Sequence, residues 1–238
     1  MRRWSMIVVL GAPGSAAADE PHRVHGGWAT VGSYQQLAFT FEVTPPIGGV
    51  PAVRRLPEVP GEPAVTLEVA QDDRGRYTVV VGELSELEAS GRLLIEVPNG
   101  DRLEPHRADF TVRTHRGERT AHPSRDGRLV LVPAPTSLAD DTSVLIGQVE
   151  LPLDPLPGGV EPGAVLAAAS VEWSADPASF DGWMVDFAAL HAAPRLFWRP
   201  IGSDEWKELG ARSEPDQAEV VGEVLGAGTW LVVGGGEP

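Results

Sequence analysis

The chain of 238 residues has no cysteine, one lysine (Lys207) and one asparagine (Asn99). Without cysteine it has no disulfide bond, no thiolate metal site, no cysteine nucleophile and no lipoprotein anchor. Its fold must therefore be stabilised by hydrophobic cores. The scarcity of lysine and asparagine, beside abundant Ala, Gly, Pro and Arg, is typical of a protein from a GC-rich bacterial genome.

Sequence signatures of catalysis are also missing. The chain contains no Gly-x-Ser-x-Gly nucleophile elbow, no His-Glu-x-x-His zinc helix, no phosphate-binding loop and no dinucleotide fingerprint. We therefore predict that it is not an enzyme and takes no cofactor. The remaining enzyme hypothesis is a secreted hydrolase assembled from loops. Its candidate residues are His191 and Asp186, although such a pair without a nucleophile is no triad.

Two groups of residues could ligate a metal ion. His106, His115 and His122 are spaced too widely for one helix face, although strands could gather them, and we expect them at the surface. The acidic pairs Asp72-Asp73 and Asp140-Asp141 do not follow the twelve-residue calcium loop, so we interpret them as turn residues. No metal site is predicted.

The net charge of −15 argues against a nucleic-acid partner, because a polyanion would be repelled by this surface. The acidity is interpreted as a means of solubility. Apart from the N-terminus, no apolar run approaches the length of a membrane span.

The N-terminus has the order of a secretory signal peptide. Arg2 and Arg3 precede a short apolar run from Trp4 to Ala12, and small residues follow up to Ala18. We predict a signal peptide over residues 1–18, cleaved after Ala18, and hence a secreted or periplasmic protein. The alternative is a buried first strand from Met6 to Leu10, because the two share a composition.

Alternating apolar residues, bounded by glycine and proline turns, predict an all-β protein. Strands are expected at residues 37–43, 65–69, 77–81, 92–97, 110–113, 129–132, 144–146, 195–199, 205–209 and 228–233. The proline-rich segment from Val50 to Pro63 is interpreted as a loop. The ten-residue spacing of short strands indicates antiparallel sandwiches of immunoglobulin-like type.

We predict two such sandwiches in tandem after the signal peptide. Residues 19–33, which show no periodicity, are expected to form a linker. Residues 34–116 form the immunoglobulin-like domain and residues 125–235 the second domain. The boundary is placed at residues 117–124, within an arginine-rich stretch that precedes a strongly acidic one.

The second half resembles a known family. The turn Asp126-Gly127, the strand 129–132, a proline corner and the segment Ser137–Thr142 leading into Val144–Ile146 are similar to the opening of ZU-five domains. These occur in zonula occludens proteins, netrin receptors, ankyrins and exported bacterial proteins. Further similarities are the segments 171–180, 195–199 and 205–209. The resemblance covers roughly 110 residues, and it implies a β-sandwich that binds proteins through its surface.

Two departures from that family are informative. Pro135-Thr136-Ser137-Leu138 stands where Gly-Ala-Leu is usual, so the corner is expected to differ. Self-cleaving relatives carry His-Phe-Ser before the last strand, whereas this chain has Gly226-Ala227-Gly228-Thr229. We therefore predict no self-cleavage.

Most aromatic side chains lie in the second half, where they are expected to form the core. Trp183 and Trp206 adjoin turns and are the candidate exposed platforms for sugar rings. The leading hypothesis is an exported, non-catalytic interaction or structural module whose partner is a protein or glycan at the cell envelope. The alternative is a carbohydrate-binding module that uses these tryptophans.

Overall fold

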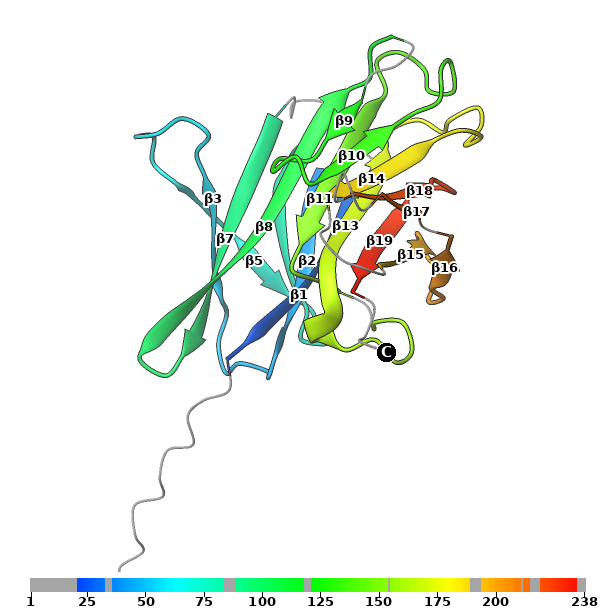
Figure 1. The fold of residues 1–238 in the computed structure, drawn as a ribbon. Helices are drawn as coiled ribbons and strands as arrows, with labels where there is room; N and C mark the ends of the chain where they lie inside the picture. Colours follow the sequence, from blue (N-terminus) through cyan, green and yellow to red (C-terminus); the bar gives the residue numbers. More distant parts are fainter. Residues whose placement is uncertain are drawn as a thin grey trace, which may run out of the picture.

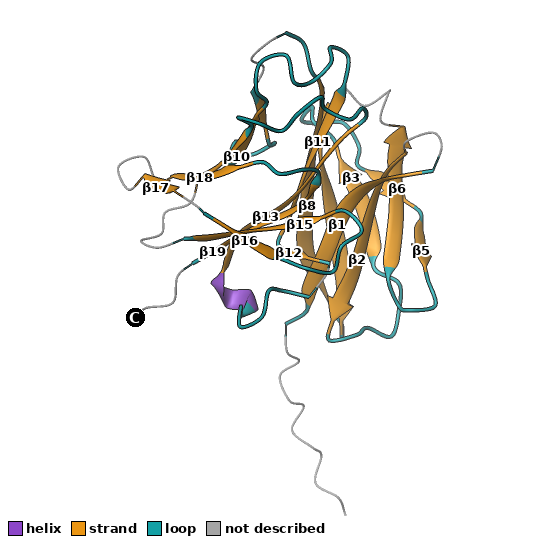
Figure 2. Cartoon of the chain, turned by 90° about the vertical axis from the view of Figure 1, so that its right-hand side faces the viewer, coloured by secondary structure: helices purple, strands orange, loops and turns teal. Residues whose placement is uncertain are grey.

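The computed structural model describes residues 21–32, 36–83, 89–117, 121–153, 155–188, 194–210, 212–214 and 219–234. The expected signal peptide lies outside these residues. In the described part the chain is almost entirely β-structure, with one short 3-10 helix, η2, at Pro162–Ala164 (Figures 1 and 2). The all-β fold class is thereby confirmed. None of the helical structure described is long and apolar enough to cross a bilayer.

The strands in the described ranges are arranged in three sheets. The N-terminal sheet has the order β12-β1-β2-β6-β5, the C-terminal sheet β17-β18-β14-β10-β9, and the central sheet β16-β15-β19-β13-β11-β8-β7-β3-β4. Their bounds are β1 Arg23–Val31, β2 Gln36–Thr44, β3 Ala52–Leu56, β4 Val65–Leu67, β5 Val69–Gln71, β6 Tyr77–Glu83, β7 Ala89–Asn99, β8 Arg102–Thr114, β9 His122–Pro123, β10 Leu129–Val132, β11 Ser143–Val149, β12 Leu151–Pro152, β13 Val165–Trp173, β14 Met184–Ala188, β15 Arg195–Pro200, β16 Lys207–Leu209, β17 Arg212–Glu214, β18 Glu219–Glu223 and β19 Gly228–Val233.

The two smaller sheets pack against opposite faces of the central sheet. Successive side chains of β11 point to opposite faces, and they enter different cores. Leu145 belongs to the core under the N-terminal sheet, whereas Val144 and Ile146 belong to the core under the C-terminal sheet. Strand β11 is therefore buried on both sides, which explains its continuous apolar run.

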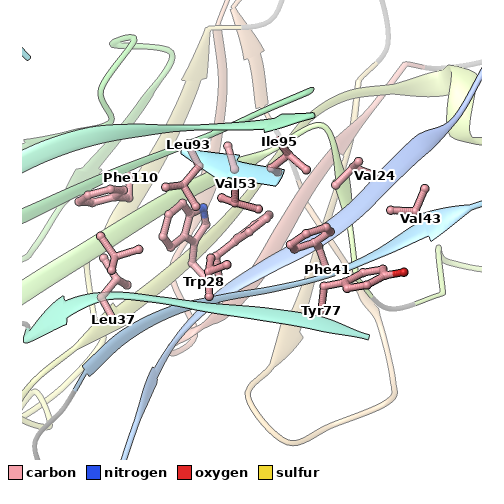
Figure 3. Close-up of a cluster of buried hydrophobic side chains, with 14 of the residues drawn as sticks. Val24, Trp28, Leu37, Phe41, Val43, Val53, Tyr77, Leu93, Ile95 and Phe110 are labelled. Carbon is pink, nitrogen blue, oxygen red and sulfur yellow. The ribbon is translucent and has the colours of Figure 1, made fainter. Parts of the chain in front are cut away.

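The first core is built around aromatic rings. The ring of Trp28 lies 4.8 Å from that of Phe39 and 5.0 Å from that of Phe110, so it joins β1, β2 and β8. Figure 3 shows Trp28 among side chains that converge from both sheets, including Val53 and Leu93. Burial of each such side chain contributes about 1.5–3 kcal/mol.

The prediction that residues 19–33 form a linker is wrong for most of that range, because Arg23–Val31 forms β1. Val24, Gly26 and Trp28 are buried at every second position, which is the period of a strand. The glycine among them hides this pattern in the sequence. Gly26 is required there because an added β-carbon would overlap the ring of Phe39.

The proline-rich segment is likewise not all loop, since Ala52–Leu56 forms β3 and pairs with β7 and β4. Pro51 and Pro57 flank this strand, so the missing N–H donors fall outside the ladder. The division into two domains at residues 117–124 stays a prediction. The central sheet continues across that point, because β8 pairs with β11.

Candidate functional site

A groove of about 340 Å³ separates the N-terminal sheet from the last strands of the central sheet. One wall is β1 at Gly26–Ala29, and the other is the segment from Arg199 to Gly202. Its floor carries Ser170, Glu172 and Thr229. The groove thus brings together residues that lie far apart in the sequence, such as Gly27 on one wall and Gly202 on the other.

The floor is a row of polar side chains across neighbouring strands. Ser170 on β13 is paired with Thr229 on β19, and Thr229 is paired with Arg199 on β15. Paired residues of adjacent strands point to the same face of a sheet, so these side chains lie side by side. Glu172, two residues after Ser170, shares that face.

The next row on the same face is apolar and covered. It contains Ala168, Leu231 and Phe197, which are paired across the same three strands. Leu156 and Val160, from the segment between β12 and η2, pack over it. The change from an apolar row under these side chains to a polar row that lines the groove marks the groove as a distinct surface.

The carboxylate of Glu172 is held in place by β1. Its Oε2 accepts hydrogen bonds from the backbone N–H and from the Oγ1 of Thr30, both at 3.1 Å. Burial raises the pKa of the Glu172 carboxyl, and the two bonds from Thr30 oppose that effect. The site holds a partly desolvated carboxyl group that can accept, and when protonated donate, a hydrogen bond.

Ser170 is a largely buried residue at the floor of the groove. The residue as a whole is only 4% exposed, and it lines the groove beside Glu172 and Thr229. Ser170 therefore offers a hydrogen-bonding group that is directed at the contents of the groove.

Arg199 is backed by a tryptophan. Its guanidinium carbon lies 5.4 Å from the ring centre of Trp206, and Trp206 Nε1 donates to the carbonyl of Pro155 at 2.7 Å. The stacked ring favours the cation and limits the motion of the side chain. This contact fixes one wall of the groove.

A second hollow of about 540 Å³ adjoins the groove at Arg76 and Leu153, which line both. The Nε of Arg76 donates to Glu42 at 2.6 Å. His25 also lines this hollow, and burial lowers the pKa of its ring. Both hollows are lined by residues of β1, the groove by Gly26–Ala29 and the second hollow by His25.

Two tryptophans are predicted to be exposed platforms for sugar rings. For Trp183 this prediction is wrong. It is fully buried in the second core, and its Nε1 donates to Ser137 Oγ at 2.6 Å. Because the ring is packed inside this core, it cannot contact a ligand. Trp206 is half-buried and stays a candidate only through its support of Arg199.

The three histidines expected at the surface are buried, so that expectation is wrong. His115 Nδ1 lies 3.2 Å from His122 Nε2, whereas His106 Nδ1 lies 3.2 Å from Glu150 Oε2. Burial, the neighbouring His115 and Arg113 lower the pKa of His122 to about 4. Within the described ranges, no three His, Asp or Glu side chains gather as a metal site would need.

The acidic pairs act in turns. Asp72 Oδ1 accepts from the backbone N–H groups of Arg74 and Arg76 at 2.9 and 2.8 Å, and Asp140 Oδ1 accepts from that of Gly117 at 2.9 Å. These bonds confirm their interpretation as turn residues. Asp186 lies on β14. His191 lies outside the described residues, so the hydrolase hypothesis built on this pair stays untested.

Sequence reasoning missed Ser170, Glu172, Thr229 and Arg199. One local signal was available, because Ser170 and Glu172 interrupt the apolar strand Val165–Trp173. Their position beside Thr229 and Arg199 depends on strand register, which the sequence pattern does not reveal.

Comparisons with protein-family models, with curated proteins and with solved structures find no match to this chain. The resemblance of its second half to ZU-five domains stays a prediction.

Proposed function

We propose that this chain is an exported, non-catalytic β-sandwich protein that acts as an interaction module at the bacterial envelope, and that its ligand binds in the groove. The observation that carries the proposal is the polar row of Ser170, Thr229 and Arg199, which lines the groove on a sheet face whose next row is apolar and covered. Polar residues in the middle of buried strands destabilise a fold unless they are satisfied, so their placement supports a role in binding.

The donor set supports binding rather than catalysis. No histidine is among the described residues that line the groove, and the Glu172 oxygen nearest β1 accepts from Thr30 rather than from Ser170. A serine nucleophile needs a base within hydrogen-bonding reach to remove its proton. The groove instead combines hydroxyl, carboxyl and guanidinium groups that can hold a ligand without reacting with it.

The envelope location rests on the signal-like start of the sequence at residues 1–18. Fractionation of the source bacterium, followed by N-terminal sequencing of the protein, tests this part of the proposal. The exported protein is expected to begin at Asp19. Recovery of the protein in the cytoplasm with residues 1–18 intact would overturn it.

Binding is tested by co-sedimentation of the mature chain with envelopes isolated from the source bacterium. The variant Thr229→Phe fills the groove, because position 229 lies on its floor and is half-buried. We expect the bound fraction of this variant to correspond to at least about a tenfold weaker affinity, a loss of about 1.4 kcal/mol.

Thr66→Phe is the matched control, because Thr66 is an exposed threonine on β4, away from the groove. It adds the same side chain to a strand, so we expect it to bind as the wild type does. Both variants must show the wild-type unfolding transition before they are compared. Equal binding of Thr229→Phe and the wild type, or failure of the wild type to sediment, would contradict the proposal.

A further inference from the structure

The floor of the groove is the face of a sheet, and this restricts what can bind there. Strands β13 and β19 each pair with a neighbouring strand on both sides, so their backbone N–H and C=O groups are used in hydrogen bonds within the sheet. Only side chains are left to recognise a ligand on this floor. A peptide that binds by adding a strand needs free backbone groups along an edge instead.

The edge of β1 that faces the groove is also engaged at both ends. The carbonyl of Gly26 accepts from the N–H of Leu153 at 2.9 Å, and the N–H of Thr30 donates to Glu172 at 3.1 Å. A peptide strand laid along β1 would have to displace both contacts. Strand addition is therefore disfavoured at this wall as well.

The side chains of the floor both donate and accept hydrogen bonds. A serine and a threonine hydroxyl have this property, and a carboxyl group with a raised pKa shares it in its protonated form. Sugar hydroxyl groups have the same dual character and stand at closely spaced positions on a ring. Ser170, Thr229 and Glu172, on two adjacent strands, offer partners at a matching density.

From this geometry we infer that the groove binds an oligosaccharide segment through Ser170, Thr229 and Glu172, with Arg199 as a donor at the wall. The inference rests on the proposed function and names the ligand class of that site. The adjoining hollow beyond Arg76 and Leu153 gives room for a chain to continue past the floor. Trp183 has no part in this recognition, and Trp206 acts only by supporting Arg199.

The test is a titration of the ¹⁵N-labelled mature chain with cellohexaose, chitohexaose and laminarihexaose in turn, followed by amide chemical shifts. At least one saccharide is expected to give saturable shifts centred on residues 170, 172 and 229. Ser170→Ala, Thr229→Val and Glu172→Gln should each weaken its binding by about 3- to 10-fold, the range for the loss of one hydrogen bond. Thr66→Val, which removes an exposed hydroxyl elsewhere, should leave it unchanged.

Absence of saturable shifts with all three saccharides at concentrations up to roughly 10 mM, a range in which weak binding is still measurable, would overturn the inference. Shifts in the groove with a lysine-containing tetrapeptide but with no saccharide would also overturn it. In either case, envelope binding that Thr229→Phe abolishes would leave the proposed function standing. Envelope binding that is unchanged by Thr229→Phe would contradict both the inference and the proposed function.

Discussion

Trp28 lies directly on the backbone of Gly147, and a β-carbon at position 147 would overlap its indole ring. The indole Nε1 also donates to the carbonyl of Gln148 at 3.3 Å. This contact joins β1 of the N-terminal sheet to β11 of the central sheet. Trp28 also lines the groove, so this contact lies at its β1 wall.

Gly147→Ala is therefore expected to destabilise the protein by about 1–3 kcal/mol, because the added methyl group forces Trp28 or the strand to move. Gly163→Ala is the control, since a β-carbon at position 163 meets nothing within 4 Å. Urea unfolding measures both. Equal midpoints for the two variants would show that Trp28 does not rest on Gly147.

Trp183 and Ser137 form a second tie, through the indole N–H and the serine oxygen at 2.6 Å in the core of the second half. A double-mutant cycle with Trp183→Phe and Ser137→Ala should give a coupling energy of about 1 kcal/mol. The indole replacement should cost more alone than the serine replacement, because it also leaves a cavity. Strictly additive effects would be inconsistent with this bond.

Local turn chemistry and strand alternation were sufficient to predict much of the fold. The strands at residues 37–43, 77–81 and 129–132 are present as β2, β6 and β10. The Asn99-Gly100 turn joins β7 to β8, and Gly100 has the positive φ of 56° that such a turn requires. These features depend on residues close in sequence, so they could be recognised without tertiary information.

Features that depend on packing between distant segments were not predicted. Strand β1 was missed because its glycine makes room for Phe39, and this reason is invisible before the two strands are paired. The groove was missed for the same reason, since Ser170, Thr229 and Arg199 meet only through strand register. The burial of His115 and His122 was missed because polarity alone does not reveal that Nδ1 of one ring pairs with Nε2 of the other.

The His115–His122 pair should make stability depend on pH. Because the pKa of His122 is about 4 in the folded protein and about 6.5 when unfolded, the unfolded state binds the proton first. The contribution of neutral His122 to the free energy of unfolding is fully present above pH 6.5 and is lost as the pH falls from 6.5 to 4. The loss is on the order of 3 kcal/mol.

Urea unfolding of the wild type and His122→Gln at pH 7 and pH 4.5 tests this dependence. The variant cannot titrate at position 122, so the stability difference in favour of the wild type should shrink at the lower pH. A difference that is constant between the two pH values would mean that His122 is not held neutral.

Glu172 should change the pH dependence of stability in the opposite direction to His122. Its pKa is raised by burial, so the folded state keeps the proton while the unfolded state releases it above its ordinary value of 4.5. The penalty is absent at low pH and grows as the pH rises through that value. Glu172→Gln removes it, and its stability relative to the wild type should increase between pH 4 and pH 7. An unchanged difference across this range would contradict the burial of a charged group at the floor.

The most direct test of the account asks where the ligand touches the protein. A benzophenone amino acid at position 201, which is 62% exposed at the rim of the groove, is compared with the same group at position 103, which is 58% exposed on β8, away from the groove. After ultraviolet irradiation with isolated envelopes, we predict a covalent adduct from position 201 and none from position 103. Adducts from position 103 alone, or equal adducts from both, would contradict the claim that the groove is the binding site.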